Sequence, residues 1–370
     1  MMRFPHSRTL IGAFALFFAA GVSACGSDEA TPSSTPTTSP PTTTTATQSP
    51  PASVTTSPTA TTTDAPTETA TIAVTDTPAA SETAARSYPK DVTDMLGRTV
   101  TIAAPPKRVV ALSPTAAELV YAVGGTIVGR ASSVKFPDAA VEASEVGTAY
   151  QPSVEAILAL NPDLIVADAV IQAQPEVSGA LEGTGVPVVF AGAASVADVS
   201  TGIELIGAVF DADADAAALV SHINDAIAAA KTKLQTAGVS AVAMIADRDQ
   251  TLYAAKANSY AGDIMATLGI TNPAQDEPDA GAFPGYTALA PEKLIEFDPD
   301  YIFTITPAPE PAPRLSTLIP QIPPFANLKA VVDQHVIELD DVLFLQAPGP
   351  RIVDAIQQIV DAVAGGSPSY

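Results

Sequence analysis

A few aromatic and basic side chains carry most of the chemical information in this 370-residue sequence. Tyrosine rings can lie against a bulky planar or lobed ligand, and arginine or lysine can pair with an anionic one. Basic residues stand out because Asp and Glu outnumber Lys and Arg by 40 to 17. The candidate ligand-binding residues are Lys135, Phe136, Tyr150, Arg248, Tyr253, Lys256, Tyr286, Gln346 and Arg351.

Each candidate also has a purely structural interpretation. A partly buried tyrosine can simply pack, and a lysine or arginine can be a solvated surface side chain. Arg351 follows Pro350 at the start of the expected last helix, so it can equally support the loop before it. Ligand binding is therefore a hypothesis that the positions of these residues in the fold must support.

Motifs for other chemistry are missing from the sequence. It contains no Gly-x-Ser-x-Gly elbow, phosphate-binding loop, dinucleotide glycine motif or metalloprotease histidine pair. In the expected folded part only His222 and His335 could supply imidazole to a free metal ion, and we expect both to be structural. We predict no catalytic residues, no metal cluster and no cofactor. The net charge of −23 argues against binding to nucleic acid or anionic lipid.

Short apolar strands alternate with helices through residues 88–211, after a hairpin expected within residues 92–102. Such alternation predicts a parallel sheet with crossover helices. Residues 212–237 are rich in alanine and free of proline, which predicts one long helix, assigned to 212–238 with its connection. Strand and helix patterns then resume through 239–370. The fold prediction is α/β, with two similar parallel-sheet lobes bridged by a single long helix and a ligand cleft between the lobes, in loops that follow the strands.

An internal repeat supports the two lobes. The segment from Val154 to Val166 matches the segment from Pro291 to Phe303, each position lying 137 residues further on (292 minus 155). Each copy contains a glutamate near the start of a predicted helix and a Pro-Asp pair before a predicted strand. The repeat predicts the same helix, turn and strand in both lobes.

The first 87 residues carry export and tether signals. Arg3 and Arg8 precede an apolar stretch too short to span a bilayer, which is typical of a secretory signal peptide. It ends in Val22-Ser23-Ala24-Cys25, which resembles the bacterial lipobox, so residues 1–25 form a signal with Cys25 as the lipidation site. Residues 26–87 are mostly Thr, Ser, Pro and Ala and are predicted to be a disordered tether. The protein is thus expected to be exported and anchored to the outer face of the cell membrane, or periplasmic, through lipid only.

From about residue 88 to 366 the sequence resembles the substrate-binding proteins of ferric-siderophore, haem and cobalamin importers. The resemblance rests on both Glu-to-Pro-Asp units and on three further segments. These are Asp94 to Val100, Arg108 to Pro114, and Ala347 to Arg351. It implies a monomer whose two lobes enclose a metal chelate, and delivery to an ABC permease dimer with its ATPase.

The resemblance also assigns roles to individual residues. It implies that Glu155 and Glu292 dock on the permease, although a glutamate near a helix start is also favoured by the helix dipole. Tyr150 falls where cobalamin-binding members carry an aromatic residue. Haem-binding members carry their tyrosine directly after the glycine where this chain has Gly147 and then Thr148, so haem ranks below siderophore. Cobalamin stays open as the alternative ligand, and an envelope enzyme or adhesion protein as the alternative class.

Overall fold

The computed structural model describes residues 88–235, 238–247, 249–281 and 283–365, which all belong to one unit of the chain. The predicted signal peptide, Cys25 and the tether of residues 26–87 lie outside the described residues.

The first sheet has five strands in the order β5-β4-β3-β6-β7, and all of them are parallel, which confirms the predicted parallel sheet for this lobe. The strands are β3 (Val109–Ala111), β4 (Ile127–Arg130), β5 (Ser144–Glu145), β6 (Leu164–Ala167) and β7 (Val188–Phe190). The helices of this lobe are α1 (Pro114–Ala122), α2 (Asp138–Val141), α3 (Val154–Ala159), α4 (Pro175–Glu182) and α5 (Val196–Phe210). β3, β6 and β7 are buried at every position, as expected for strands covered on both faces.

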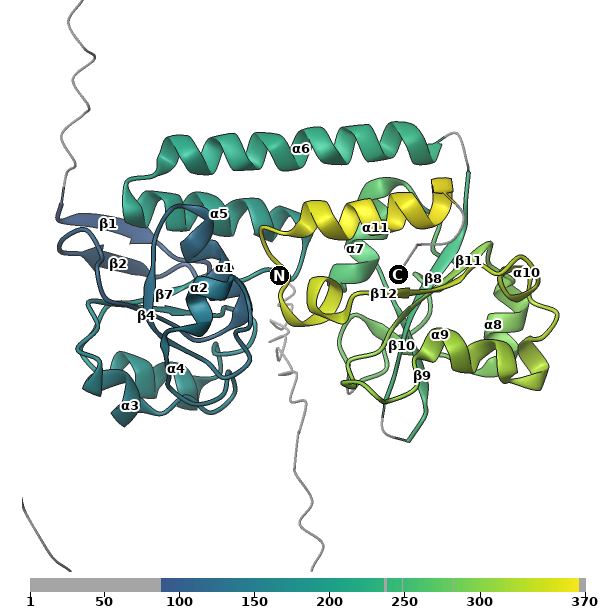
Figure 1. Cartoon of the computed structure of the whole chain (residues 1–370), viewed down its shortest axis with the longest axis horizontal. Helices are drawn as coiled ribbons and strands as arrows, with labels where there is room; N and C mark the ends of the chain where they lie inside the picture. The colour runs from purple at the N-terminus through teal and green to yellow at the C-terminus, as the bar shows by residue number, and fades with distance from the viewer. Residues whose placement is uncertain (1–87, 236–237, 248, 282, 366–370) are drawn as a thin grey trace, which may run out of the picture. The chain divides into compact units, whose positions relative to one another are not determined.

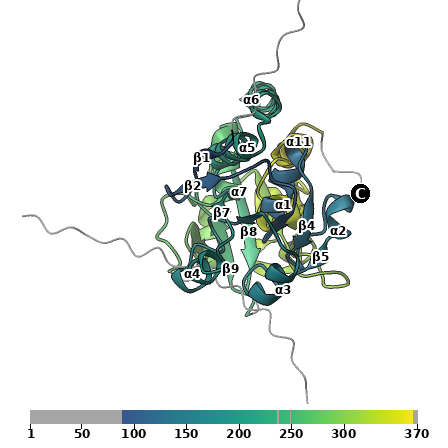
Figure 2. The same cartoon turned by 90° about the vertical axis from the view of Figure 1, so that its left-hand side faces the viewer.

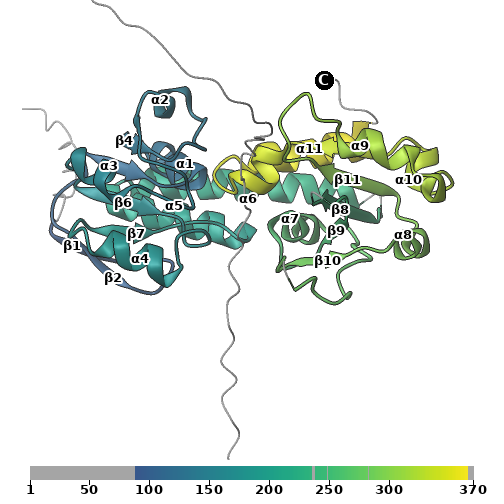
Figure 3. The ribbon, with the colours of Figure 1, turned by 90° about the horizontal axis from the view of Figure 1, so that it is seen from below.

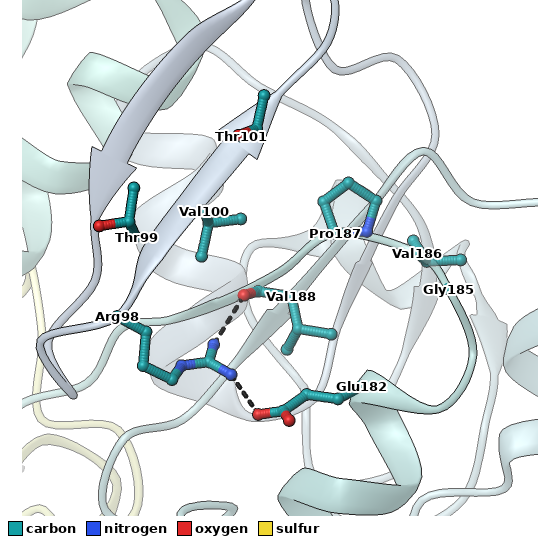
Figure 4. A pocket seen from close by; sticks show the side chains of 9 residues that line it. All are labelled: Arg98, Thr99, Val100, Thr101, Glu182, Gly185, Val186, Pro187 and Val188. Atoms are coloured by element: carbon teal, nitrogen blue, oxygen red, sulfur yellow. Dashed lines mark hydrogen bonds and ion pairs between the residues drawn. The ribbon is translucent and has the colours of Figure 1, made fainter.

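The expected hairpin opens the lobe as β1 (Lys90–Thr93) and the antiparallel β2 (Thr99–Ile102). Its turn covers the edge strand β7. Arg98 Nη2 donates to the Val188 carbonyl at 2.8 Å and to Asp94, while Met95 N donates to the Phe190 carbonyl at 3.0 Å. Figure 4 shows Arg98 reaching across a surface hollow to Glu182. These bonds satisfy backbone groups that an edge strand would otherwise leave unpaired.

The second sheet has the order β10-β9-β8-β11-β12 and is mixed rather than parallel. Its strands are β8 (Ala241–Ala246), β9 (Leu252–Ala255), β10 (Tyr286–Ala288), β11 (Tyr301–Ile305) and β12 (Val336–Leu339). β9 is antiparallel to both of its neighbours, so the prediction of a parallel sheet was wrong for this half of the second lobe. The connection from β8 to β9 is far too short for a crossover, and Asp247 accepts hydrogen bonds from the Asp249 and Thr251 backbones to close a hairpin turn.

Helices surround the second sheet. They are α7 (Tyr260–Leu268), α8 (Pro291–Phe297), α9 (Leu315–Leu318), α10 (Lys329–Val332) and α11 (Ile352–Gly365). Two 3₁₀ turns (Ile319–Gln321 and Pro323–Phe325) and a π-helical turn (Val342–Gln346) connect them. None of the described helices is both long and apolar enough to cross a membrane.

The predicted long helix is α6, which spans Asp213–Gln235. It packs on α5 and on α11, and Figure 1 shows it running along both lobes above these two helices. Viewed at right angles, α6 lies outermost with α5 beneath it (Figure 2). Gly207 allows the close approach of α5, because a Cβ at that position would come within 2.5 Å of the Ala216 Cβ.

The cores explain why α6 can join the lobes. One face of each sheet packs into a core that belongs to its own lobe. This core includes Val110, Leu112 and Ile165 in the first lobe and Val242, Met244 and Ile302 in the second. The opposite faces belong to one continuous apolar cluster that also contains residues of α5, α6, α7 and α11. Figure 3 shows the two sheets as separate bodies. They are therefore linked through a shared helical layer.

Candidate functional site

The buried side chain of Gln172 organises the loops that follow the strands of the first lobe. Its amide nitrogen donates to the Leu112 and Ala149 carbonyls, and its oxygen accepts from the Asp168 backbone. It therefore ties together the segments that follow β3, β5 and β6. This arrangement places Tyr150, the residue after Ala149, at the mouth of the loops, where its side chain is 38% exposed.

Asp168 is fully buried next to this glutamine. Its carboxylate accepts hydrogen bonds from the Ser113 hydroxyl (2.9 Å), Val170 N (2.8 Å) and Ile171 N (3.2 Å). Burial raises the pKa of the Asp168 carboxyl, while these three donors lower it by a smaller amount. The loop from Asp168 to Ile171 is thus held closely against the start of α1.

The second lobe contributes the start of α7. Ser259 caps this helix by accepting from Gly262 N at 3.2 Å, and its hydroxyl donates to the Lys256 carbonyl at 2.8 Å. Position 262 requires glycine, because a Cβ there would lie 1.8 Å from that carbonyl oxygen. The tight turn brings Asn258, Ser259 and Tyr260 to the surface that faces the first lobe.

These loops enclose a cavity of about 190 Å³ with lining residues from both lobes. The first lobe provides Thr115, Tyr150, Asp168, Val170, Ile171, Ala193 and Ala194. The second provides Asn258, Ser259, Tyr260, Pro284, Tyr286, Leu345, Gln346 and Pro348. We call this cavity the inter-lobe cavity. Its position agrees with the predicted cleft, and its lining is mainly apolar and aromatic, as ligand sites usually are.

Three tyrosines line the cavity, and burial raises the pKa of each phenol. The pKa of Tyr286 rises to about 12, and that of Tyr260 also lies above its ordinary value. For Tyr150 the nearby Asp168 adds to the effect of burial. The phenols therefore stay protonated at neutral pH and can donate hydrogen bonds. The Tyr260 hydroxyl is buried and makes no hydrogen bond of good geometry within the described part of the chain, although the Gly349 backbone lies near enough to lower its pKa slightly against the effect of burial.

An ion pair joins the two lobes beside the cavity. Arg351 donates to both oxygens of the buried Glu118 carboxylate, at 3.0 Å from Nε and 2.5 Å from Nη2. The guanidinium also lies 4.3 Å from the ring centre of Phe136, on the first lobe. Burial raises the pKa of Glu118, and the Arg351 guanidinium lowers it by a smaller amount. Arg351 and Phe136 thus contact each other instead of lining the cavity.

The structure brings only part of the predicted set together. Tyr150, Tyr286 and Gln346 line the inter-lobe cavity, whereas Phe136, Tyr253, Lys256 and Arg351 do not. Lys135 is exposed outside it. Lys256 forms an ion pair with Asp279 at 2.6 Å, and the Tyr253 hydroxyl donates to Asp247 at 2.9 Å in the hairpin turn. Arg248 lies outside the described residues.

The antiparallel direction of β9 explains this partition in the second lobe. The register pairs Ala246 with Leu252 and Met244 with Ala254, so the hairpin turn and the segment after Ala255 lie at opposite ends of β9. The segment after β9 supplies Asn258, Ser259 and Tyr260 to the cavity, and the sequence reasoning missed these three residues. A signal was present, because Ser259 directly precedes the apolar pattern of a helix.

The repeat units take equivalent positions in the two lobes. In the first lobe β3 pairs with β6 at Val109 and Leu164, and in the second β8 pairs with β11 at Ala241 and Tyr301. Tyr301 lies 137 residues after Leu164 (301 minus 164), which is the spacing of the repeat. In each lobe the aspartate of the Pro-Asp pair, just before β6 or β11, accepts hydrogen bonds from the backbone just before the neighbouring strand, β3 or β8. Asp163 accepts from Lys107 N and Arg108 N at 2.9 Å, and Asp300 accepts from Ser240 N at 2.8 Å.

The predicted docking glutamates occupy matched positions in these units. Glu155 is the second residue of α3 and Glu292 is the second residue of α8, and both are exposed. Three positions later each helix carries a large exposed aliphatic side chain, Leu158 at 42% and Ile295 at 44% exposure. We call these four residues the paired surface. Both lobes therefore present the same acidic and apolar combination.

The two histidines of the described region lie apart from each other in different surroundings. His335 stacks on Tyr301 with ring centres 4.3 Å apart, and its Nδ1 lies 3.1 Å from the Asp300 carbonyl. His222 is exposed on α6. No group of three His, Cys, Asp or Glu side chains suited to a metal ion occurs among the described residues.

Residues 109–343 match the protein family described as "Periplasmic binding protein", and the chain belongs to this family. It is 23% identical over 283 residues to the ABC transporter substrate-binding lipoprotein YvrC of Bacillus subtilis, covering 75% of this chain and 86% of that one. It is 26% identical over 288 residues to a cobalamin-binding protein of Halobacterium salinarum, covering 76% of each chain.

The fold is also that of solved binding proteins. The structure of Staphylococcus aureus SirA complexed with staphyloferrin B matches with a TM-score of 0.62, at 21% identity and over 74% of this chain and 98% of that one. This likeness supports the arrangement of two α/β lobes and a long helix.

Proposed function

We propose that this protein captures a bulky metal chelate outside the cytoplasm and delivers it to an ABC import permease. The observation that carries the proposal is the inter-lobe cavity, which is built from loops of both lobes of a periplasmic binding protein fold. A ferric siderophore is the first candidate ligand. Cobalamin is the second, because Tyr150 and Tyr286 offer rigid aromatic faces to the cavity and a relative is named as a cobalamin-binding protein.

Docking on the permease is assigned to the paired surface. Glu155 and Glu292 lie at equivalent places in two similar lobes, so one chain can present two matched acidic contacts to a permease dimer. The exposed Leu158 and Ile295 beside them add an apolar contact on each lobe. Exposed charges set orientation and association rate, and the apolar side chains contribute affinity.

Membrane attachment is assigned to Cys25. The cysteine follows an export signal in the sequence, and the relative YvrC is named as a lipoprotein. Acyl chains on Cys25 would hold the protein on the outer face of the membrane, with residues 26–87 as the tether between anchor and binding lobes.

Titration of the purified chain with ferric siderophores, cobalamins and haem tests the proposed function. Binding of one class should raise the melting temperature and saturate with ligand concentration. A folded protein that responds to no chelate would contradict the proposal and favour an enzyme or an adhesion protein of the envelope.

A further inference from the structure

The lining of the inter-lobe cavity is nearly free of charge. Among the lining residues that the structure describes there is no lysine, arginine or histidine, and the one ionisable acid is Asp168. The remaining polar groups are the phenols, the Thr115 and Ser259 hydroxyls and the Asn258 and Gln346 amides. Asp168 makes the lining either neutral or negative, depending on whether its carboxyl is protonated.

The basic side chains nearest in the chain to the lining residues are already paired with acids. Arg351 holds the buried Glu118 carboxylate through two hydrogen bonds, and Lys256 pairs with Asp279 at 2.6 Å. Neither side chain lines the cavity. A negatively charged ligand would therefore have to break one of these ion pairs to gain a cation, which costs much of the free energy that the new contact supplies.

The helix ends at the cavity do not replace a cation. The first residue of α1 is Pro114, which has no N–H, and the Ser113 and Ser259 hydroxyls already accept from Ala116 N and Gly262 N. Asp263 adds negative charge in the first turn of α7. The positive potential that a helix start offers to an anion is thus reduced at both helices.

The same groups suit a ligand that carries amides or hydroxyls without net negative charge. Tyr150, Thr115, Asn258 and Gln346 line the cavity, and their hydroxyl and amide groups can form hydrogen bonds with such a ligand. An anion that lost its water here would pay the desolvation cost of its charge and gain only neutral hydrogen bonds.

We propose that the inter-lobe cavity selects metal chelates that are neutral or positively charged and discriminates against anionic ones. This inference rests on the proposed function and names the class of chelate. It replaces the expectation that scarce basic residues would attract an anionic iron complex.

Binding measurements with four probes of known charge test the selection. Cyanocobalamin is neutral and ferrioxamine B is cationic, whereas ferric citrate and haemin are anionic. At least one of the first pair should bind the purified chain at least tenfold more tightly than either anion. Tighter binding of ferric citrate or haemin would overturn the inference and leave the proposed function intact. Binding of no probe, followed by no response to any chelate in the wider panel, would remove both.

Variants at the lining sharpen the test. Val170 lines the cavity and is 48% exposed, so Val170→Lys should place a cation beside the ligand without disturbing the core. The affinity for ferric citrate should rise at least threefold in Val170→Lys and stay constant in Val170→Gln, the uncharged control. If Val170→Lys bound ferric citrate no more tightly than the wild type, this result would contradict the placement of the ligand against this lining.

Arg248 lies outside the described residues and supplies an independent check. The inference requires that Arg248→Gln leave the affinity for the preferred probe unchanged. It also requires that the affinity for neutral cyanocobalamin, where this probe binds, vary by less than twofold as salt is raised from low to physiological concentration, because no ion pair with that ligand is formed. A large loss in the variant, or a steep salt dependence of cyanocobalamin binding, would overturn the inference.

Discussion

At the scale of single residues, two buried side chains at the inter-lobe cavity, Gln172 and Asp168, determine how the loops of the first lobe lie. Gln172 links three of these loops, and Asp168 binds two backbone N–H groups and the Ser113 hydroxyl. Neither side chain has to touch the ligand to affect binding, because Tyr150 follows directly on a carbonyl that Gln172 holds.

Asp168 should give stability a characteristic dependence on pH. Burial raises its carboxyl pKa in the folded protein, so the folded state retains this proton to higher pH than the unfolded state. The stabilising contribution is complete below the unfolded pKa of about 4 and is lost as pH rises through the folded value. The free energy of unfolding of the wild type, relative to that of Asp168→Asn, should therefore fall as pH rises above about 4.

Denaturant titration at several pH values measures this difference. Asparagine keeps an oxygen for Val170 N and Ile171 N, so the variant is expected to fold. Parallel pH curves for the two proteins would show that Asp168 does not titrate differently on folding.

Tyr150 is expected to contribute its ring to the ligand. Tyr150→Ala should weaken chelate binding at least tenfold, or about 1.4 kcal/mol, because it removes an aromatic face from the mouth of the cavity. Tyr150→Phe, which keeps the ring, should lose less than threefold. Isothermal titration calorimetry of both variants makes the comparison, and equal affinities in Tyr150→Ala and the wild type would remove this residue from the site.

At the scale of elements, the matched helices α3 and α8 suggest a separation between binding and delivery. Both helices have an exposed glutamate as their second residue. Helix α4 has one as well, Glu176, so this position alone does not mark a docking residue. A favourable interaction with the helix dipole is common to all three. Only Glu155 and Glu292 belong to the repeat.

The double variant Glu155→Ala with Glu292→Ala should abolish chelate uptake by cells while leaving the affinity in solution unchanged. Both side chains are exposed, so their loss removes contacts with the permease and no packing within the lobes. Glu176→Ala is the control with the same helix position and should transport normally. Loss of solution binding in the double variant would show that the glutamates have a structural role.

The aliphatic half of the paired surface has its own test. Leu158→Ser with Ile295→Ser should lower the affinity for the permease in detergent or lipid nanodiscs by at least fivefold, because it removes two exposed apolar contacts. Val332→Ser, at an exposed residue of α10 outside the repeat, is the matched control. If both variants bound the permease with equal affinity, Leu158 and Ile295 would not contribute to docking.

At the scale of the whole molecule, the lobes are connected both by packing and by charge. A single apolar cluster runs through the helical layer that they share, and Arg351 reaches from one lobe to Glu118 of the other. Removal of Glu118 leaves the arginine without its carboxylate in a partly buried position. Glu118→Ala should therefore destabilise the protein by about 2 kcal/mol, less than for a fully buried pair.

Thermal and denaturant unfolding measure this cost. The double variant Glu118→Leu with Arg351→Met should recover most of it, because an apolar pair avoids the unpaired charge. Lys329→Ala breaks an exposed ion pair with Asp300 and should change stability little. If Glu118→Ala were as stable as the control, the ion pair between the lobes would not contribute to their association.

The parts of the fold that were predictable from the sequence depend on local pattern. Apolar strands with intervening helices predicted the parallel first sheet, the alanine-rich run predicted α6, and the repeated Glu-to-Pro-Asp unit predicted matched positions in two lobes. These signals lie in neighbouring residues, whose periodicity and turn chemistry act within one element. Tyr150, Tyr286 and Gln346 were expected at the cleft because segments at the ends of strands lie at the edges of sheets, and all three line the inter-lobe cavity. Their role in ligand binding stays a prediction.

Only the tertiary structure decided which side chains meet at the inter-lobe cavity. The reversal of β9 carries Tyr253 away from it and brings Asn258, Ser259 and Tyr260 toward it. Arg351 and Lys256 form ion pairs outside its lining. The sequence by itself determined the elements, the repeat and the family. Strand direction and the pairing of charges depend on contacts between residues far apart in the chain, and no local pattern encodes them.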